Sequence, residues 1–291
     1  MPTTPDTKAD TRRLRHINIS LVPESRFAVP QSDGYSLYGA LLNQLAAVDE
    51  TTSTRVHDAA LGGLRVSALR GTFGKSDRRH HKTVLPDQTY QLSLGVTDPR
   101  DVEIFQALVQ ALVLNGDQLG LTNGTLRVQE FESTNTTHAD LLEQTNEYQN
   151  PTIEMRFRSP TCIEEANGVT AMFPHRVPVF NSLLGKWNKT APEELQFDID
   201  RDTIAGSVIE KPNARAYRTH SVLVNRVTNE DGENRNIFRQ GFSGECEYAF
   251  KNATPSVQNA TTSLALFAEF SGIGSAVSRG CGDVTVEVSE R

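Results

Sequence analysis

The feature that most constrains the fold lies near the C-terminus, where two Gly–hydrophobic–Gly triplets are separated by five residues. The triplets are Gly272-Ile273-Gly274 and Gly280-Cys281-Gly282. The segment before them, from Thr254 to Phe270, is apolar with helical spacing, and the segment after them, from Asp283 to Val288, alternates as a strand does. The glycines are therefore predicted to form a loop that leads from a helix into a strand.

This order of elements argues against the familiar nucleotide-binding loops. Dinucleotide-binding and P-loop glycines follow a strand and open a helix, so that phosphate lies on the helix N-terminus. Here the order is reversed, Val277 stands where GxGxxG needs glycine, and no GK[ST] follows. The glycines still allow left-handed backbone and N–H groups free to hold a phosphate, with Ser275, Ser278 and Arg279 as further donors. A tight turn with a helix C-cap explains the spacing equally well.

Composition indicates a cytoplasmic protein without a bound metal or cofactor. At 291 residues the chain can form one large or two ordinary domains. No run of eighteen apolar residues predicts a membrane span, and the polar N-terminus lacks the apolar run of a signal peptide. Cys162, Cys246 and Cys281 are widely spaced without a CxxC pair, which argues against a disulfide framework or a zinc site and suits a reducing cytosol.

The charge pattern is acidic overall with local basic patches. The net charge is −7, which is awkward for a nucleic-acid binder, but the cations are 22 Arg against 7 Lys. This pattern is typical of proteins from salt-loving (halophilic) archaea. The densest basic patch lies in a predicted loop between two strands, and we expect it to contact RNA phosphates: Arg78, Arg79, His80, His81 and Lys82. Adjacent histidines in a loop lack the usual spacing of metal ligands.

Periodicity predicts an α+β fold made of two tandem ferredoxin-like (RRM-like) βαββαβ domains. Residues 1–11 are polar and expected to be disordered. Residues 12–137 form the N-terminal domain, 138–151 a polar linker, and 152–291 the C-terminal domain with its glycine-rich loop at 272–282. The N-terminal strands are expected at 12–22, 64–68, 89–96 and 119–131, and its helices at 35–48 and 101–112. The C-terminal strands are expected at 152–163, 213–227, 236–250 and 283–288, and its helices at 177–187 and 254–270.

Several motifs together resemble one family of RNA-processing enzymes. The glycine spacing between the last helix and the last strand is the first. The others are Ser159-Pro160-Thr161, Val177 to Leu184 followed by Trp187-Asn188, and an N-terminal block with Val56-His57-Asp58 and then a strand carrying Ser67. Over nearly its whole length the chain resembles the CRISPR precursor-RNA-processing endoribonucleases (Cas6 type) of the RAMP superfamily of RNA-binding folds.

The resemblance implies metal-independent cleavage within each CRISPR repeat, giving a 5′-hydroxyl and a 2′,3′-cyclic phosphate. In the family a histidine of this segment is commonly catalytic, often with a tyrosine and a lysine, and here that histidine is His57. Tyr38 and Tyr35 lie on or near the first helix and both could reach His57; we prefer Tyr38. No lysine lies between His57 and Arg70, so Arg65 is the expected cation for the phosphorane.

The resemblance also implies that the protein binds CRISPR repeat RNA and delivers the guide to other subunits of a surveillance (Cascade-like) complex. It implies no membrane as a partner. The predicted RNA contacts besides the basic loop are Gly272, Gly274, Ser275, Ser278, Arg279, Gly280 and Gly282. One alternative is a non-catalytic RAMP subunit, which predicts that His57 faces solvent away from Tyr38 and Arg65. A second is a small-molecule enzyme that holds a nucleotide on the glycine loop.

Overall fold

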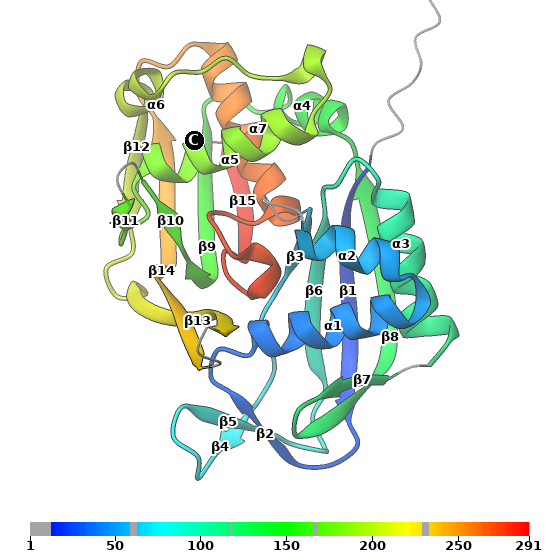
Figure 1. The fold of residues 1–291 in the computed structure, drawn as a ribbon. Helices are drawn as coiled ribbons and strands as arrows, with labels where there is room; N and C mark the ends of the chain where they lie inside the picture. The colour runs from blue at the N-terminus through cyan, green and yellow to red at the C-terminus, as the bar shows by residue number, and fades with distance from the viewer. Residues whose placement is uncertain (1–12, 59–62, 117, 166–167, 229–232, 291) are drawn as a thin grey trace, which may run out of the picture.

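The structure is a computed structural model that describes residues 13–58, 63–116, 118–165, 168–228 and 233–290. The predicted disordered N-terminus, residues 1–11, lies outside these ranges. Two antiparallel sheets stand side by side, one built from each half of the chain, and the main helices cover one side of both (Figure 1).

The N-terminal sheet has the strand order of a ferredoxin-like unit, β3-β6-β1-β8-β7. Its strands are β1 (Leu14–Pro23), β3 (Leu64–Val66), β6 (Tyr90–Val96), β7 (Gln118–Leu121) and β8 (Gly124–Thr136). The central strand β1 pairs with β6 and β8, and its alternating Ile17, Ile19 and Leu21 are fully buried. The helices are α1 (Gly34–Val48), α2 (Glu50–Asp58) and α3 (Asp101–Val109), which continues as a π-helical turn, Gln110–Leu114.

The C-terminal sheet repeats this order as β12-β14-β9-β15, with β13 also paired to β14. Its strands are β9 (Pro151–Thr161), β12 (Val208–Pro212), β13 (Arg218–Thr228), β14 (Asn234–Phe250) and β15 (Val284–Glu290). The helices are α4 (His138–Thr145), α5 (Arg176–Thr190), α6 (Arg201–Ser207) and α7 (Pro255–Ser271), and a short pair β10 (Ile163–Glu164) and β11 (Thr170–Ala171) lies beside β14. The predicted α+β class with two ferredoxin-like units is therefore confirmed.

Two polar segments that lack clear periodicity are helical in the structure. The first is α2, which holds His57; it begins where the Asp49 carboxylate accepts hydrogen bonds from the N–H and hydroxyl of Thr52. The second is α4, within the segment expected to be a linker. Its capping box joins Thr137 and Asp140, and it packs on α7. In both cases capping side chains supply the helical signal that hydrophobic spacing lacks.

Two predicted loops contain strands of a small third sheet, with the order β2-β5-β4. These strands are β2 (Phe27–Pro30), β4 (Gly74–Lys75) and β5 (His81–Val84). They are two to four residues long, too short for alternation to reveal. The basic patch at residues 78–82 is therefore the turn of a hairpin and the start of β5.

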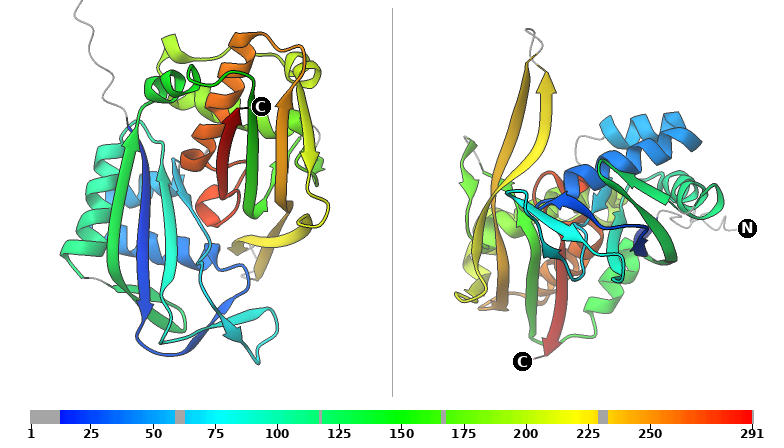
Figure 2. Two further views of the ribbon diagram at one scale, coloured as in Figure 1. Left: turned by 180° about the vertical axis from the view of Figure 1, so that it is seen from behind. Right: turned by 90° about the horizontal axis from the view of Figure 1, so that it is seen from below.

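Helix α7 holds the two halves together. It packs on β9 and β15 of its own sheet and on β1, β3 and β6 of the other, and lies behind the strands when the molecule is seen from the back (Figure 2, left). The close approach requires Gly95 on β6, because a Cβ there would lie 2.0 Å from the carbonyl oxygen of Phe270. The end of α7, where the glycine-rich loop begins, is thus fixed against both halves. Among the described residues, no helix is long and apolar enough to cross a membrane.

Candidate active site

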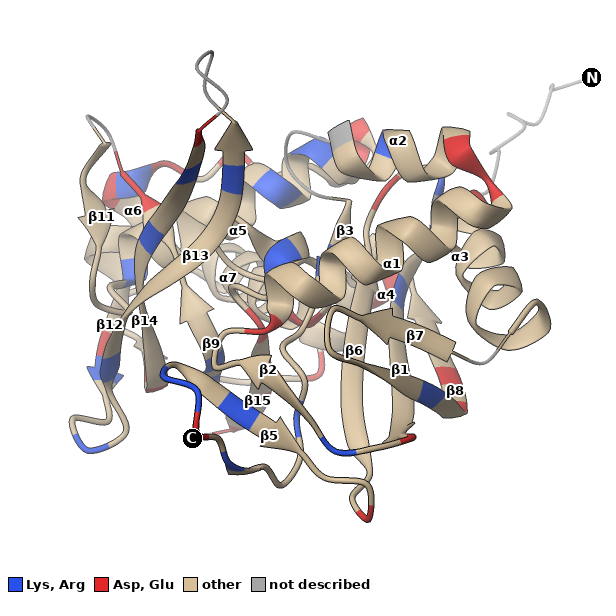
Figure 3. Ribbon diagram, turned by 60° about the horizontal axis from the view of Figure 1, so that its bottom comes forward, with Lys and Arg blue, Asp and Glu red and all other residues tan. Residues whose placement is uncertain are grey.

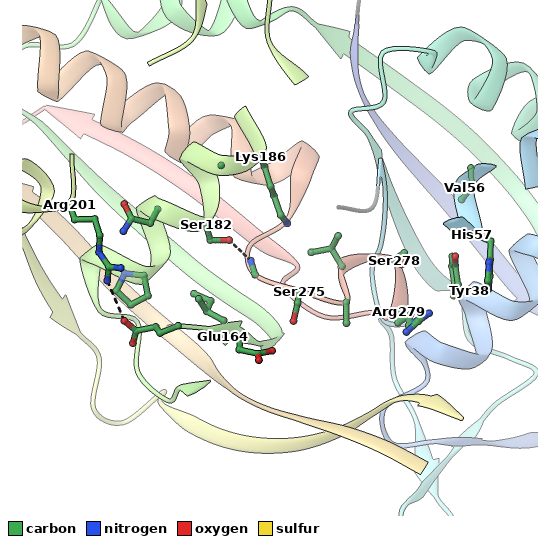
Figure 4. A pocket seen from close by; sticks show the side chains of 18 residues that line it. Tyr38, Val56, His57, Glu164, Ser182, Lys186, Arg201, Ser275, Ser278 and Arg279 are labelled. Atoms are coloured by element: carbon green, nitrogen blue, oxygen red, sulfur yellow. Dashed lines mark hydrogen bonds and ion pairs between the residues drawn. The ribbon is translucent and has the colours of Figure 1, made fainter. Parts of the chain in front are cut away.

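A cleft of about 560 Å³ opens between the two halves, on the side of the helices. One wall comes from α1 and α2, which contribute Tyr38 and His57; the other comes from α5, β10 and the glycine-rich loop (Figure 4). The loop contributes Ser275, Ser278 and Arg279. Residues more than 200 positions apart in the sequence therefore share one cleft.

His57 and Tyr38 both line this cleft, and Figure 4 shows them at the same end of it. His57 is exposed near the end of α2, next to the buried Val56 that anchors this turn. The Tyr38 side chain is buried, and the Arg279 guanidinium carbon lies 5.9 Å from the centre of its ring, at the outer range of a cation–π contact. An imidazole, a phenol and a guanidinium are thus brought together from three segments.

A contact between two glycines places the tyrosine beside the arginine. Gly34, at the start of α1, lies against Gly280 of the glycine-rich loop, and a Cβ on Gly34 would be 2.3 Å from the Gly280 Cα. Only a residue without a side chain fits at this position. Tyr38 lies one helical turn after Gly34, so the contact sets the distance between its ring and Arg279.

The glycines of the loop are structural. Gly272 caps α7 and donates its N–H to Ala268, Gly274 donates to the Ser182 hydroxyl, and Gly282 donates to the carbonyl of Pro160. The expectation that these N–H groups are free to hold a phosphate is therefore wrong for all three. The reason is that they close the loop on itself and on its neighbours. What the loop offers to the cleft is therefore its polar side chains, Ser275, Ser278 and Arg279, of which Ser275 donates its hydroxyl to the carbonyl of Cys162.

Helix α5 supplies two polar residues that the sequence analysis missed. Ser182 and Lys186, one turn apart, both line the cleft. Lys186 Nζ donates to the carbonyl oxygens of Ser271 and Gly272, at 3.2 and 2.9 Å, and burial lowers its pKa to about 7. Their signal in the sequence is a serine and a lysine at helical spacing within an otherwise apolar face.

The far end of the cleft carries paired charges. Glu164, on β10, forms an ion pair with Arg239 of β14, and Glu165 lies 3.5 Å from Arg201 of α6. These pairs are largely exposed and so contribute little to stability. In the described part of the chain, no group of three His, Cys, Asp or Glu side chains is arranged to hold a metal ion.

Comparison with known proteins finds one similar family. Residues 155–284 match the family model described as CRISPR-associated endoribonuclease Cas6. A Cas6 product complex is similar to the chain with a TM-score of 0.69 at 18% identity, covering 95% of this chain and all of the other. The chain is similar to the Cas6 family over residues 155–284 and shares the fold of Cas6 structures over nearly its whole length. Other similar structures are Thermus thermophilus Cas6 (TM-score 0.65, 17% identity, covering 95% of this chain and 99% of the other) and the product of a Cas6-related gene from Pyrococcus furiosus (TM-score 0.60, 13% identity, covering 94% and 98%). At these identities the structural likeness shows the shared fold. A search of curated proteins finds no match.

Arg65 does not line the cleft that contains His57, contrary to expectation. Its side chain is buried between the sheets, where Nη1 lies 2.5 Å from Asp283 and Nη2 donates to Ser93 at 3.0 Å. Arg65 borders a second cleft of about 440 Å³, which His16 also lines and which shares no lining residue with the first. The side chain takes this direction because β3 is buried on both faces, which the sequence pattern cannot reveal.

The basic hairpin also lies outside the cleft that contains His57. Arg78, Arg79 and His80 are exposed in its turn, and Figure 3 marks the lysines and arginines of this hairpin and of β13 and β14. Lys82 instead lies 2.9 Å from the buried Asp33 and 3.9 Å from the centre of the Phe73 ring. The charge of Lys82 is thus paired within the protein, and its contact with RNA stays a prediction.

Proposed function

We propose that the protein is a metal-independent endoribonuclease that cuts CRISPR precursor transcripts within each repeat. The observation that carries the proposal is the shared cleft, in which His57 and Tyr38 face Arg279 of the glycine-rich loop within a Cas6 fold. The family description and the product complexes among similar structures name RNA-processing proteins, and we extend that activity to this chain.

The chemistry is an internal transesterification. The ribose 2′-oxygen bonds to the adjacent phosphorus while the bond from phosphorus to the 5′-oxygen breaks. A base removes the proton of the 2′-hydroxyl, and an acid protonates the leaving 5′-oxygen. The products are a 2′,3′-cyclic phosphate and a 5′-hydroxyl, and every step can be served by proton transfer and charge stabilisation.

In this scheme His57 transfers a proton, as general base or general acid, because imidazole changes charge near neutral pH. Its exposed position at the mouth of the cleft lets it reach a phosphodiester. Tyr38 orients the histidine or the phosphate through its hydroxyl. Arg279 takes the role that the sequence assigned to Arg65: a guanidinium remains charged and stabilises the phosphorane without giving up a proton.

Recognition of the repeat combines the cleft with surrounding cations. Arg78, Arg79 and His80 of the exposed hairpin are placed to contact phosphates away from the cut. The cut RNA would then pass to other subunits of a surveillance complex. One observation favours the alternative of a non-catalytic RAMP subunit: Arg65, expected beside the histidine, is absent from the residues that line this cleft.

The test is incubation of the protein with a repeat-containing RNA in EDTA, followed by mass analysis of the fragments. The proposal expects one cut per repeat, a cyclic phosphate on the upstream fragment and a hydroxyl on the downstream one. Tight binding without a cut would support the non-catalytic subunit. Cleavage that stops in EDTA would contradict metal independence.

A further inference from the structure

Lys186 is a buried lysine at the junction of α7 and the glycine-rich loop. Only 8% of the residue is exposed, and its neighbours Leu183 and Trp187 on α5 are fully buried. Its ammonium nitrogen lies 3.2 Å from the carbonyl oxygen of Ser271, the last residue of α7, and 2.9 Å from that of Gly272. These carbonyls belong to the helix C-terminus, where a positive charge is stabilised.

Ser182, one turn earlier on α5, holds the next part of the loop. Its hydroxyl accepts a hydrogen bond from the Gly274 N–H at 2.9 Å. The opposite side of Gly274 is closed by Cys162, because a Cβ there would lie 2.4 Å from the Cys162 carbonyl oxygen. Ser182 and Lys186 together therefore fix the path of the loop as it enters the cleft (Figure 4).

The charge on Lys186 is poorly compensated in the free protein. Its hydrogen-bond acceptors are neutral carbonyls, and burial followed by repulsion from Arg65 of β3 lowers its pKa to about 7. Arg65 is itself paired with Asp283. The other charged or titratable groups of the cleft and of α7 are Tyr38 on α1, His57 on α2, Glu164 and Glu165 at β10, Arg201 on α6, Arg279 in the loop and Glu269 on α7.

A phosphate in this cleft would raise the pKa of Lys186 again, since an opposite charge nearby favours the protonated form of an amine. We propose that Lys186 is a positioning residue of the RNA site, which holds the glycine-rich loop in place and takes up a proton when an RNA phosphate enters the cleft. The inference rests on the proposed function, because it needs RNA to bind here.

The measurable consequence is that RNA binding is linked to one proton. Below pH 7 Lys186 is already charged and binding is independent of its titration. Above pH 7 the proton must be taken from solution, so Kd rises with pH by up to about tenfold per pH unit. A lysine that only held the loop, without changing its charge, would give no such dependence.

The experiment measures Kd for a repeat RNA from pH 6 to 9 at constant ionic strength, by fluorescence anisotropy. The parent protein carries His57→Ala, which prevents cleavage and removes the other titratable group beside Tyr38. On this background we compare Lys186→Met, Lys186→Arg and Lys189→Met, which removes an exposed lysine of the same helix.

The parent and Lys189→Met are expected to lose affinity above pH 7. Lys186→Arg should bind with a flat profile, because arginine stays protonated, and Lys186→Met should bind more weakly at pH 6.5, also with a flat profile. An unchanged slope in Lys186→Met, or a flat profile in the parent, would overturn the inference. No RNA binding by the parent at any pH would instead overturn the proposed function, and with it this role. Lys186→Arg keeps the test decisive if Lys186→Met fails to fold.

Discussion

Arg65 Nη1 lies 2.5 Å from Asp283 Oδ1, in an ion pair that joins β3 of the N-terminal half to the residue before β15. The side chains are 1% and 6% exposed. Breaking one side of a buried pair leaves the other charge uncompensated, at a cost of about 3–5 kcal/mol. Arg65→Met and Asp283→Asn should each lower the free energy of unfolding by this amount in urea denaturation, and the double variant should cost less than the sum of the two.

The exposed pair of Arg156 and Glu154, at 3.0 Å, provides a matched control. Arg156→Met should leave stability near that of wild type, since solvent screens this pair. Additive losses in the double variant would show that Arg65 and Asp283 do not act as a pair. A fully stable Arg65→Met protein would contradict the structural role that replaces the predicted catalytic one.

His16, in the second cleft, makes the free energy of unfolding depend on pH in the acidic range. Burial, with repulsion from Arg65, lowers its pKa from 6.5 to about 4. The unfolded chain therefore binds a proton between pH 6.5 and 4 that the folded protein does not, so this contribution is complete above pH 6.5 and is lost as pH falls toward 4. It amounts to roughly 3 kcal/mol at most.

The measurement is urea unfolding of wild type and His16→Asn at pH 4, 5, 6 and 7. Wild type should lose more stability across this range than the variant, because asparagine takes up no proton. Parallel curves for the two proteins would show that His16 titrates alike in the folded and unfolded states.

The sequence predicts the elements of this fold better than their contacts. Hydrophobic periodicity locates the long strands, the main helices and the helix-to-strand position of the glycine-rich loop, because each signal is local. The meeting of Gly34 with Gly280 is not local: it depends on how two halves dock through α7. The same holds for Arg65, whose position on a strand is predictable but whose direction depends on burial of both faces of β3.

The backbone amides of the glycine-rich loop show a second limit of prediction from the sequence. Glycine-rich spacing predicts backbone freedom, yet whether an N–H group is free depends on acceptors elsewhere in the chain, such as Ser182 for Gly274 and Pro160 for Gly282. Lys186 cannot be predicted for a related reason. A lysine in a sequence is expected to be exposed to solvent, and only the structure shows that this one is buried against two carbonyl oxygens.

Gly274→Ala tests whether the path of the loop matters for activity. Gly274 has φ of 80°, and the added Cβ would lie 2.4 Å from a backbone oxygen, so the loop must shift. We expect a loss of about 1–3 kcal/mol in stability and a clear fall in cleavage. The measurement pairs thermal unfolding with single-turnover cleavage.

Gly185→Ala is the control for this change. Gly185 also lines the cleft but lies within α5, where a Cβ meets no atom within 4 Å. This substitution should stabilise the protein by roughly 0.5–1 kcal/mol and leave cleavage near wild type. Equal effects of the two variants would mean that the loop tolerates displacement.

Arg279 and the hairpin arginines are expected to affect different steps. Arg279→Ala removes the guanidinium beside Tyr38 and should lower the single-turnover rate about 10²–10³-fold at saturating protein. Arg78→Ala with Arg79→Ala should raise Kd and reduce its salt dependence while leaving that rate unchanged, because these residues lie outside the cleft. A normal rate in Arg279→Ala would remove it from the proposed chemistry.

The most direct test of the account is the single-turnover rate of repeat cleavage in EDTA, compared between wild type and His57→Ala. Thr54→Ala, an exposed change on the same helix, controls for damage to α2. We expect one cut in wild type and Thr54→Ala, and a rate about 10²–10⁴-fold lower in His57→Ala with RNA binding retained. Cleavage by His57→Ala at the wild-type rate would contradict the assignment of His57 as the proton-transferring residue.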